Sequence, residues 1–121
     1  MVLRRQQFIT LIQEISQLEA DFCSALSDPT RLLIIYALAE EPHNVTELTN
    51  ELDIIQPTVS RHLKTLRDRG LVYTVRNGSS ITYHLGDKRL TQALDLLRAV
   101  MRDRLAHRAN IAKETKATIN A

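Results

Sequence analysis

Apolar residues recur every three or four positions in two long stretches of the chain, one toward each end. The first stretch contains Phe8, Leu11, Ile12, Ile15, Leu18 and Phe22. The second contains Leu90, Leu94, Leu97, Met101 and Leu105. This spacing places the apolar side chains on one face of a helix, so we predict helices over residues 4–22 and 88–112. The apolar pattern then decays, and residues 117–121 are expected to form a frayed tail.

A shorter apolar segment follows the first of these helices. Asp28 followed by Pro29 is typical of a helix start, because the carboxylate caps the free N–H groups and proline fits the first turn. We predict that this helix continues to about Ala39, where residues 41–44 interrupt it.

Two more helices are predicted in the middle of the chain. The first covers residues 45–52. The second begins near Gln56, with Pro57 in its first turn and Gly70 at its carboxyl end. Two short helices joined by a tight turn, here over residues 45–69, are typical of a helix-turn-helix.

The pattern changes to short β-prone segments directly after Gly70. These segments cover residues 71–75 and 81–85, and Asn77-Gly78 lies between them. Asn and Gly tolerate the positive φ angles of a tight turn, so the pair predicts a β-hairpin. We interpret residues 71–85 as the wing of a winged helix-turn-helix.

The predicted fold is mainly α with a small β-hairpin, in the order α-α-α-α-β-β-α, and residues 1–116 are expected to form a single domain. At ~1.5 Å per residue the last helix spans roughly 40 Å, more than a domain of this size covers alone. We therefore predict a homodimer that forms through the first and last helices. The alternative is that both apolar stripes pack inside one protomer.

The helix that begins near Gln56 has two different faces. Val59, Leu63 and Leu66 share one face, and Thr58, Ser60, Arg61, Lys64 and Thr65 lie on the other. Residues 56–89 carry a net charge of +5, although the whole chain carries only +2. Cations mixed with short hydrogen-bonding side chains suit a DNA-binding surface, and a solvated charged helix is the simpler alternative.

Nine residues are candidates for DNA contact. Those in the first turns of this helix are expected to meet base edges, Arg61 reading guanine and Gln56 adenine; Lys64 and Arg67 are placed for phosphates. The turn of the hairpin is expected to reach an adjacent minor groove. The full set is Gln56, Thr58, Ser60, Arg61, Lys64, Arg67, Arg76, Asn77 and Gly78.

Two motifs together resemble a known family. They are residues 25–35, ALSDPTRLLII, and residues 56–64, QPTVSRHLK, followed by Leu66 and by Gly70-Leu71-Val72. Over roughly residues 20–85 the chain is similar to the ArsR/SmtB family of winged-helix repressors. The resemblance implies a homodimer that binds an inverted-repeat operator on double-stranded DNA and is released by an inducer. Inducers in this family are most often metal or metalloid ions, and some members sense sulfur or redox species.

The metal sites of that family do not carry over to this sequence. Its thiolate site would fall on Asn44, Val45, Thr46 and Thr49, none of which is a cysteine. Its site on the last helix would fall on Asp87, Arg89, Val100 and Asp103. Soft ions require thiolates, and Arg89 places a cation where a neutral ligand is needed. We therefore predict no metal site and no cofactor, with Asp87, Asp103 and His107 as weak metal candidates, and the inducer is not identified.

Cys23 is the single cysteine and therefore excludes an intrachain disulfide. Because Phe22 and Leu26 flank it, we expect a buried structural cysteine, with a thiol-based redox or sulfur sensor as the alternative. His62 is expected to pack within the domain or to contact a phosphate. It shares no ligand spacing with His43 or His84.

Other classes of protein fit the sequence less well. It has three glycines and no glycine-rich phosphate loop, and it has no paired carboxylates in motif spacing with a histidine, so an enzyme is not predicted. A winged helix that serves only as a protein-interaction module remains an alternative to specific DNA binding. No apolar run approaches the ~20 residues of a membrane span, and we expect a cytoplasmic protein.

Overall fold

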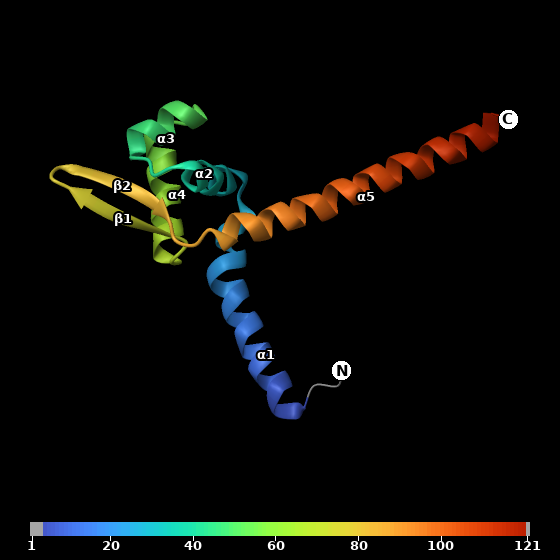
Figure 1. Cartoon of the computed structure of the whole chain (residues 1–121), viewed down its shortest axis with the longest axis horizontal. Helices are drawn as coiled ribbons and strands as arrows, with labels where there is room; N and C mark the ends of the chain where they lie inside the picture. Colours follow the sequence, from blue (N-terminus) through green and yellow to red (C-terminus); the bar gives the residue numbers. More distant parts are fainter. Residues whose placement is uncertain (1–3, 121) are drawn as a thin grey trace. The chain divides into compact units, whose positions relative to one another are not determined.

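The computed structural model of the protein describes residues 4–120. The chain forms two compact units, residues 1–87 and residues 88–121, which we describe separately. The first unit contains α1 (Arg5–Leu18), the π-helical turn η1 (Glu19–Cys23), the 3₁₀ turn η2 (Ala25–Ser27), α2 (Pro29–Glu40), α3 (Val45–Leu52), α4 (Gln56–Asp68), β1 (Val72–Asn77) and β2 (Ser80–Leu85). The second is α5 (Arg89–Asn120) (Figure 1). This is the predicted winged helix-turn-helix order.

The core lies where α2, α3 and α4 pack on one another and on the hairpin. The side chains that solvent does not reach at all are Ile34, Ile35, Leu48, Val59, Leu63, Leu66 and Leu71. Burial of each such side chain contributes about 1.5–3 kcal/mol to the free energy of unfolding. The apolar face predicted for the helix at Gln56 therefore faces this core, which confirms the orientation of that helix.

Local capping explains where the helices begin. The Asp28 carboxylate accepts hydrogen bonds from the backbone N–H groups of Thr30 (2.8 Å) and Arg31 (3.1 Å), as the sequence predicted for a helix start. Asn44 and Glu47 cap α3 reciprocally, through bonds of 2.8 and 3.0 Å. The turn between α3 and α4 passes through Asp53, whose φ of 54° is left-handed.

The hairpin differs from the prediction in the position of its turn. The antiparallel register pairs Asn77 with Ser80, so Gly78 and Ser79 form a two-residue loop and Asn77 is the last residue of β1. Within residues 4–120, Gly78 is the loop residue with positive φ (62°), and Asn77 does not have one. A turn that needs positive φ only at its first central residue suits glycine followed by serine, so the predicted Asn77-Gly78 turn is displaced by one residue.

The wing is joined to the α2–α3 connection at His43. His43 and Tyr83 exchange backbone hydrogen bonds of 3.2 and 2.8 Å. The buried His43 ring also has Nδ1 2.7 Å from the Glu41 carbonyl oxygen and Nε2 2.5 Å from the Glu51 carboxylate. These contacts hold β2 against the helices and fix the base of the wing.

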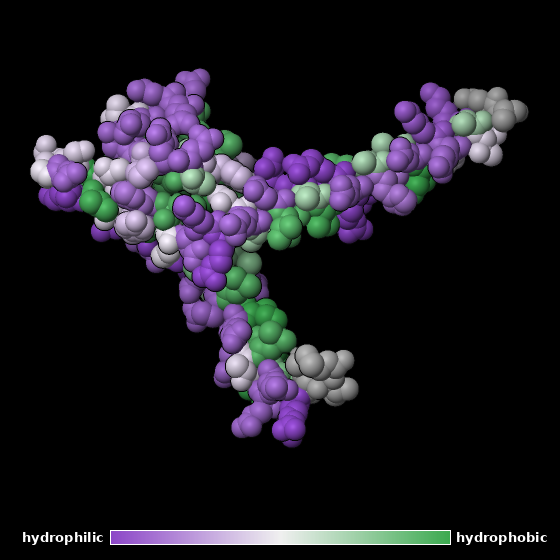
Figure 2. Space-filling model, in the orientation of Figure 1, coloured by the Kyte–Doolittle hydropathy of each residue, from purple (hydrophilic) through white to green (hydrophobic). Residues whose placement is uncertain are grey.

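The predicted first helix is present but changes its geometry near its end. The α-helix ends at Leu18, and the π-helical turn η1 follows, with the Ser24 N–H donating to the Glu19 carbonyl oxygen at 3.2 Å. No residue of α1 is buried. Figure 2 shows the apolar side chains as a green stripe along α1.

The last helix extends past its predicted end. α5 contains 32 residues, about 48 Å at ~1.5 Å per residue, and runs through Asn120 where we predicted an end near residue 112 and a tail over 117–121. The physical reason is composition, since residues 106–120 contain neither glycine nor proline and include alanine, lysine and glutamate, which favour helix. No helix among the described residues has the length and apolar character needed to cross a membrane.

Candidate nucleic-acid interface

The outer face of α4 is exposed because its inner face is fully buried. At about 100° per residue, the buried Val59, Leu63 and Leu66 leave Arg61 and Lys64 near the centre of the opposite face. Ser60 and Arg67 lie together on one side of this centre, and all four side chains are exposed. The remaining predicted helix residues are Gln56, which is exposed at the first turn, and Thr58, which is half-buried.

The cations on this face are available to a ligand. Among the described residues, the Arg61 guanidinium forms no hydrogen bond or ion pair. Lys64 Nζ lies 2.9 Å from Asp68 Oδ2, with the two side chains 78% and 58% exposed. An exposed pair of this kind contributes only about 0.3–0.5 kcal/mol, so a phosphate can replace the carboxylate at little cost.

The tip of the wing forms a second exposed patch. Arg76, Asn77 and Gly78 are all exposed at the turn of the hairpin, and Arg76 pairs in register with Ile81. The structure thus places the nine predicted residues in two patches, the outer face of α4 and the tip of the wing.

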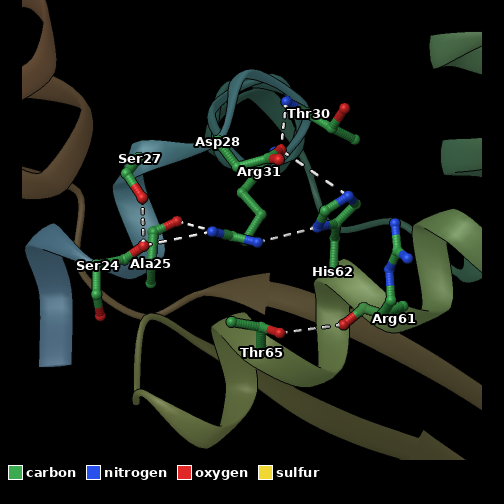
Figure 3. A network of polar contacts seen from close by, with 9 residues as sticks. All are labelled: Ser24, Ala25, Ser27, Asp28, Thr30, Arg31, Arg61, His62 and Thr65. Carbon is green, nitrogen blue, oxygen red and sulfur yellow. Dashed lines mark hydrogen bonds and ion pairs between the residues drawn. The ribbon is translucent and has the colours of Figure 1, made fainter.

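A polar network that the sequence did not predict lies behind α4, on the side away from the exposed cations. His62 is only 6% exposed, and its Nδ1 lies 3.2 Å from Nη1 of Arg31 (Figure 3). Its Nε2 lies 3.9 Å from Asp28 Oδ1. We call these three residues the Asp28–Arg31–His62 network. The signal in the sequence was a histidine placed between the buried positions Val59 and Leu66 of an otherwise apolar face.

The ionisation of this network follows from burial and charge. Burial lowers the pKa of His62 from its ordinary value of 6.5, and Arg31 and Arg61 lower it further, while Asp28 opposes them. The backbone N–H of Arg31 is the main cause that lowers the pKa of Asp28, and His62 contributes to the same direction. His62 is therefore held in its neutral form at neutral pH. The predicted packing role of His62 agrees with this position.

The sensing candidates are placed differently from the expectation. Cys23 is exposed at the end of η1, so the expectation of a buried cysteine was wrong for the protomer. The reason is that the chain buries Ala25 rather than Cys23 as it turns from η1 toward α2. Asp103 and His107 are exposed on α5. Within residues 4–120, no group of three or more His, Cys, Asp or Glu side chains is arranged to hold a metal ion.

The fold and the exposed cationic face of α4 define the protein as a winged helix-turn-helix DNA-binding protein. The comparisons with known proteins agree. The family described as "Bacterial regulatory protein, arsR family" matches residues 28–74. The biofilm growth-associated repressor of Xylella fastidiosa (strain Temecula1) is 37% identical over 78 residues, which cover 64% of this chain and 68% of that protein.

Two further comparisons extend this result. The HTH-type transcriptional regulator NmtR of Mycobacterium tuberculosis is 41% identical over 76 residues, 63% of each chain. The crystal structure of the transcriptional repressor BigR from Xylella fastidiosa superposes with a TM-score of 0.64 at 32% identity, covering 81% of this chain and 96% of that one. The protein belongs to the ArsR family, a family of DNA-binding transcriptional repressors and not of enzymes.

Proposed function

We propose that the protein is a homodimeric repressor that binds an inverted-repeat operator and is released from it by an inducer. The outer face of α4 enters the major groove in each half-site, with Gln56, Thr58, Ser60 and Arg61 at base edges and Lys64 and Arg67 at phosphates. Arg76, Asn77 and Gly78 at the tip of the wing contact an adjacent minor groove. The relatives named as repressors support the direction of regulation.

One observation carries this proposal. Arg61 stands near the centre of an exposed helix face and lies opposite a fully buried apolar stripe, and its guanidinium has no polar partner among the described residues. An arginine held on a rigid helix without an internal partner is able to form the bidentate contact by which guanine is read. A helix whose charged face only kept the domain soluble would not need an arginine without an internal partner at the centre of that face.

The exposed apolar stripes support the homodimer. The side chains of Phe8, Leu11, Ile12, Ile15 and Leu18 on α1 are 39–53% exposed. On α5, those of Leu97, Val100, Met101 and Leu105 are 54–66% exposed. Rows of this kind on two long helices mark a protein interaction surface, and a second copy of the chain is the partner that two half-sites require. In a two-fold dimer the two copies of α4, the recognition helices, meet half-sites about 10 bp apart.

The test is a fluorescence anisotropy titration of the full chain on DNA from upstream of its own gene, at several salt concentrations. We expect preference for one inverted repeat over scrambled DNA, and an affinity that falls steeply with salt. Binding with neither property would support a protein-interaction module instead.

The release step is tested on the same DNA. Metal ions, arsenite, peroxide and polysulfide are added to the complex, and Cys23→Ser is compared with the original chain. The exposure of Cys23 favours one specific alternative, a thiol-based sensor. Release by peroxide or polysulfide that Cys23→Ser abolishes would establish that alternative. Release by a metal ion directs mutation to Asp87, Asp103 and His107.

A further inference from the structure

We propose that Arg31 and His62 are positioning residues for the recognition helix, and that their hydrogen bond makes operator binding weaken at acidic pH. The inference rests on the proposed operator binding, and it assigns a role to residues that do not face the DNA. It starts from the Asp28–Arg31–His62 network behind α4 (Figure 3).

Arg31 joins two parts of the chain that are distant in sequence. Its Nε donates to the Ala25 carbonyl oxygen at 2.5 Å, and its Nη2 donates to the Ser24 carbonyl oxygen at 3.3 Å. Its Nη1 meets His62 Nδ1 at 3.2 Å. The guanidinium therefore connects the segment that follows α1 to the back of the recognition helix.

A second cation makes a parallel connection two turns further along. Arg69 directly follows α4, and its Nη1 donates to the Ala20 carbonyl oxygen at 2.9 Å and lies 3.6 Å from Asp21 Oδ1. The recognition helix is thus attached at two points to residues 20–25. If α1 forms the proposed dimer contacts, the orientation of each recognition helix is set through these two attachments.

The protonation state of His62 decides whether the first attachment exists. A guanidinium has donors and no acceptor, so Nδ1 must accept and the neutral ring carries its proton on Nε2. A second proton would go to Nδ1 and would face the guanidinium across the 3.2 Å contact. That contact then becomes a repulsion between two cations, and the hydrogen bond is lost.

The surroundings of His62 favour the neutral ring. The charged groups around it are Asp28 and Arg31 on α2 and Arg61 on α4 itself. Two of the three are cations, the ring is buried, and the distance of 3.9 Å to the Asp28 carboxylate is too long for a hydrogen bond. The conformation with the Arg31–His62 hydrogen bond binds a proton at His62 more weakly than a conformation without that bond. Acid therefore shifts the population toward the conformation without the bond.

Two variants distinguish the effect of the hydrogen-bond acceptor at position 62 from the effect of protonating His62. His62→Asn keeps an oxygen acceptor two bonds from Cβ, where Nδ1 stands, and does not titrate. His62→Leu keeps apolar volume without an acceptor. We expect the affinity of the original chain for its operator to fall below the pKa of His62, by up to about tenfold per pH unit for each protomer of the dimer. His62→Asn should bind within a few-fold of it at pH 7.5 without this decline, and His62→Leu should bind weakly at every pH.

His107→Asn, which replaces a histidine outside the Asp28–Arg31–His62 network, is the matched control and should keep the acidic decline. Circular dichroism at each pH reports whether each variant is folded. Folded His62→Leu with the affinity of the original chain, or His62→Asn with the original decline, would overturn the proposal.

Nitrogen-15 NMR of the imidazole rings tests the same inference without DNA. We expect His62 of the original chain at pH 7.5 to carry its proton on Nε2 alone, and a proton on Nδ1 would refute the contact. This result does not depend on operator binding. A chain without an operator preference therefore contradicts the proposed function, whereas the wrong tautomer contradicts the role of His62.

Discussion

At the scale of single residues, α4 carries neighbouring side chains of which one must be exposed and the other buried. Arg61 is exposed and its guanidinium has no polar partner among the described residues, while the neighbouring His62 is buried and held by α2. Adjacent positions on a helix differ by about 100°, so one step along the chain separates a DNA-facing position from a core-facing one.

Replacing Arg61 by alanine is expected to cost about 1–3 kcal/mol of operator binding and to relax discrimination at one base position. Lys64→Ala is the matched control, because a lost phosphate contact weakens binding to all sequences and lowers the salt slope by about 0.9 for each protomer of the dimer. Anisotropy titrations on a set of single-base operator variants measure both effects. An equal loss on every sequence for Arg61→Ala would make it a phosphate contact.

The charge of Asp28 can be removed without removing the cap of α2. Asp28→Asn keeps an oxygen acceptor for the N–H groups of Thr30 and Arg31 but removes the negative charge that favours protonated His62. We expect the pKa of His62 to fall further below 6.5, measured by NMR titration of the ring protons. A rise in that pKa would show that Asp28 does not act on His62 through its charge.

The lowered pKa of His62 also determines how the free energy of unfolding changes with pH. At high pH the ring is neutral in both states. As the pH falls below 6.5, the unfolded chain takes up a proton that the folded chain resists, so the free energy of unfolding decreases until the folded-state pKa is passed. Urea unfolding at pH 7.5 and 5.5 should show this decrease in the original chain, and a smaller one in His62→Asn.

At the scale of elements, the wing depends on a close backbone approach at its base. The Gly86 N–H donates to the Leu71 carbonyl oxygen at 2.9 Å, and a Cβ at position 86 would lie 2.9 Å from that same oxygen. The nearest atoms to this Cβ all belong to the backbone of Gly70 and Leu71, so they cannot move aside as the end of a flexible side chain could.

Gly86→Ala is therefore expected to destabilise the fold by about 1–3 kcal/mol, as other insertions into packed sites do. Gly78→Ala is the comparison, because its site is open and only its φ of 62° is unfavourable, about 1–2 kcal/mol for a left-handed residue. Thermal unfolding of both variants measures the difference. If Gly86→Ala did not change the unfolding temperature, the distance between position 86 and the Leu71 carbonyl oxygen would be longer than in the structure.

At the scale of the whole molecule, the long helices carry more apolar surface than their own units bury. No residue of α1 is buried, and on α5 the side chains of Leu96 and Leu97 are 70% and 66% exposed. Surfaces of this kind are stable in water when a partner covers them.

Ile12→Lys is expected to convert the proposed dimer into monomers and to weaken operator binding by more than tenfold, because it places a charge in the middle of the α1 stripe. Gln13→Lys adds the same charge one residue further along the helix, off that stripe, and should leave the dimer intact. Sedimentation velocity measures the oligomeric state of both. A dimeric Ile12→Lys would remove α1 from the interface.

Local patterns in the sequence were enough to predict the order of the elements, the start of α2 at Pro29, the buried face of α4 and the presence of a wing. Helical periodicity, caps and turn residues act over a few positions, so they can be read directly from the chain. The tertiary structure alone decided the rest. Arg31 and His62 are 31 positions apart and meet only because α2 packs on α4, and Cys23 is exposed because of how η1 leads into α2. Contacts between distant segments depend on packing in three dimensions, which periodicity does not encode.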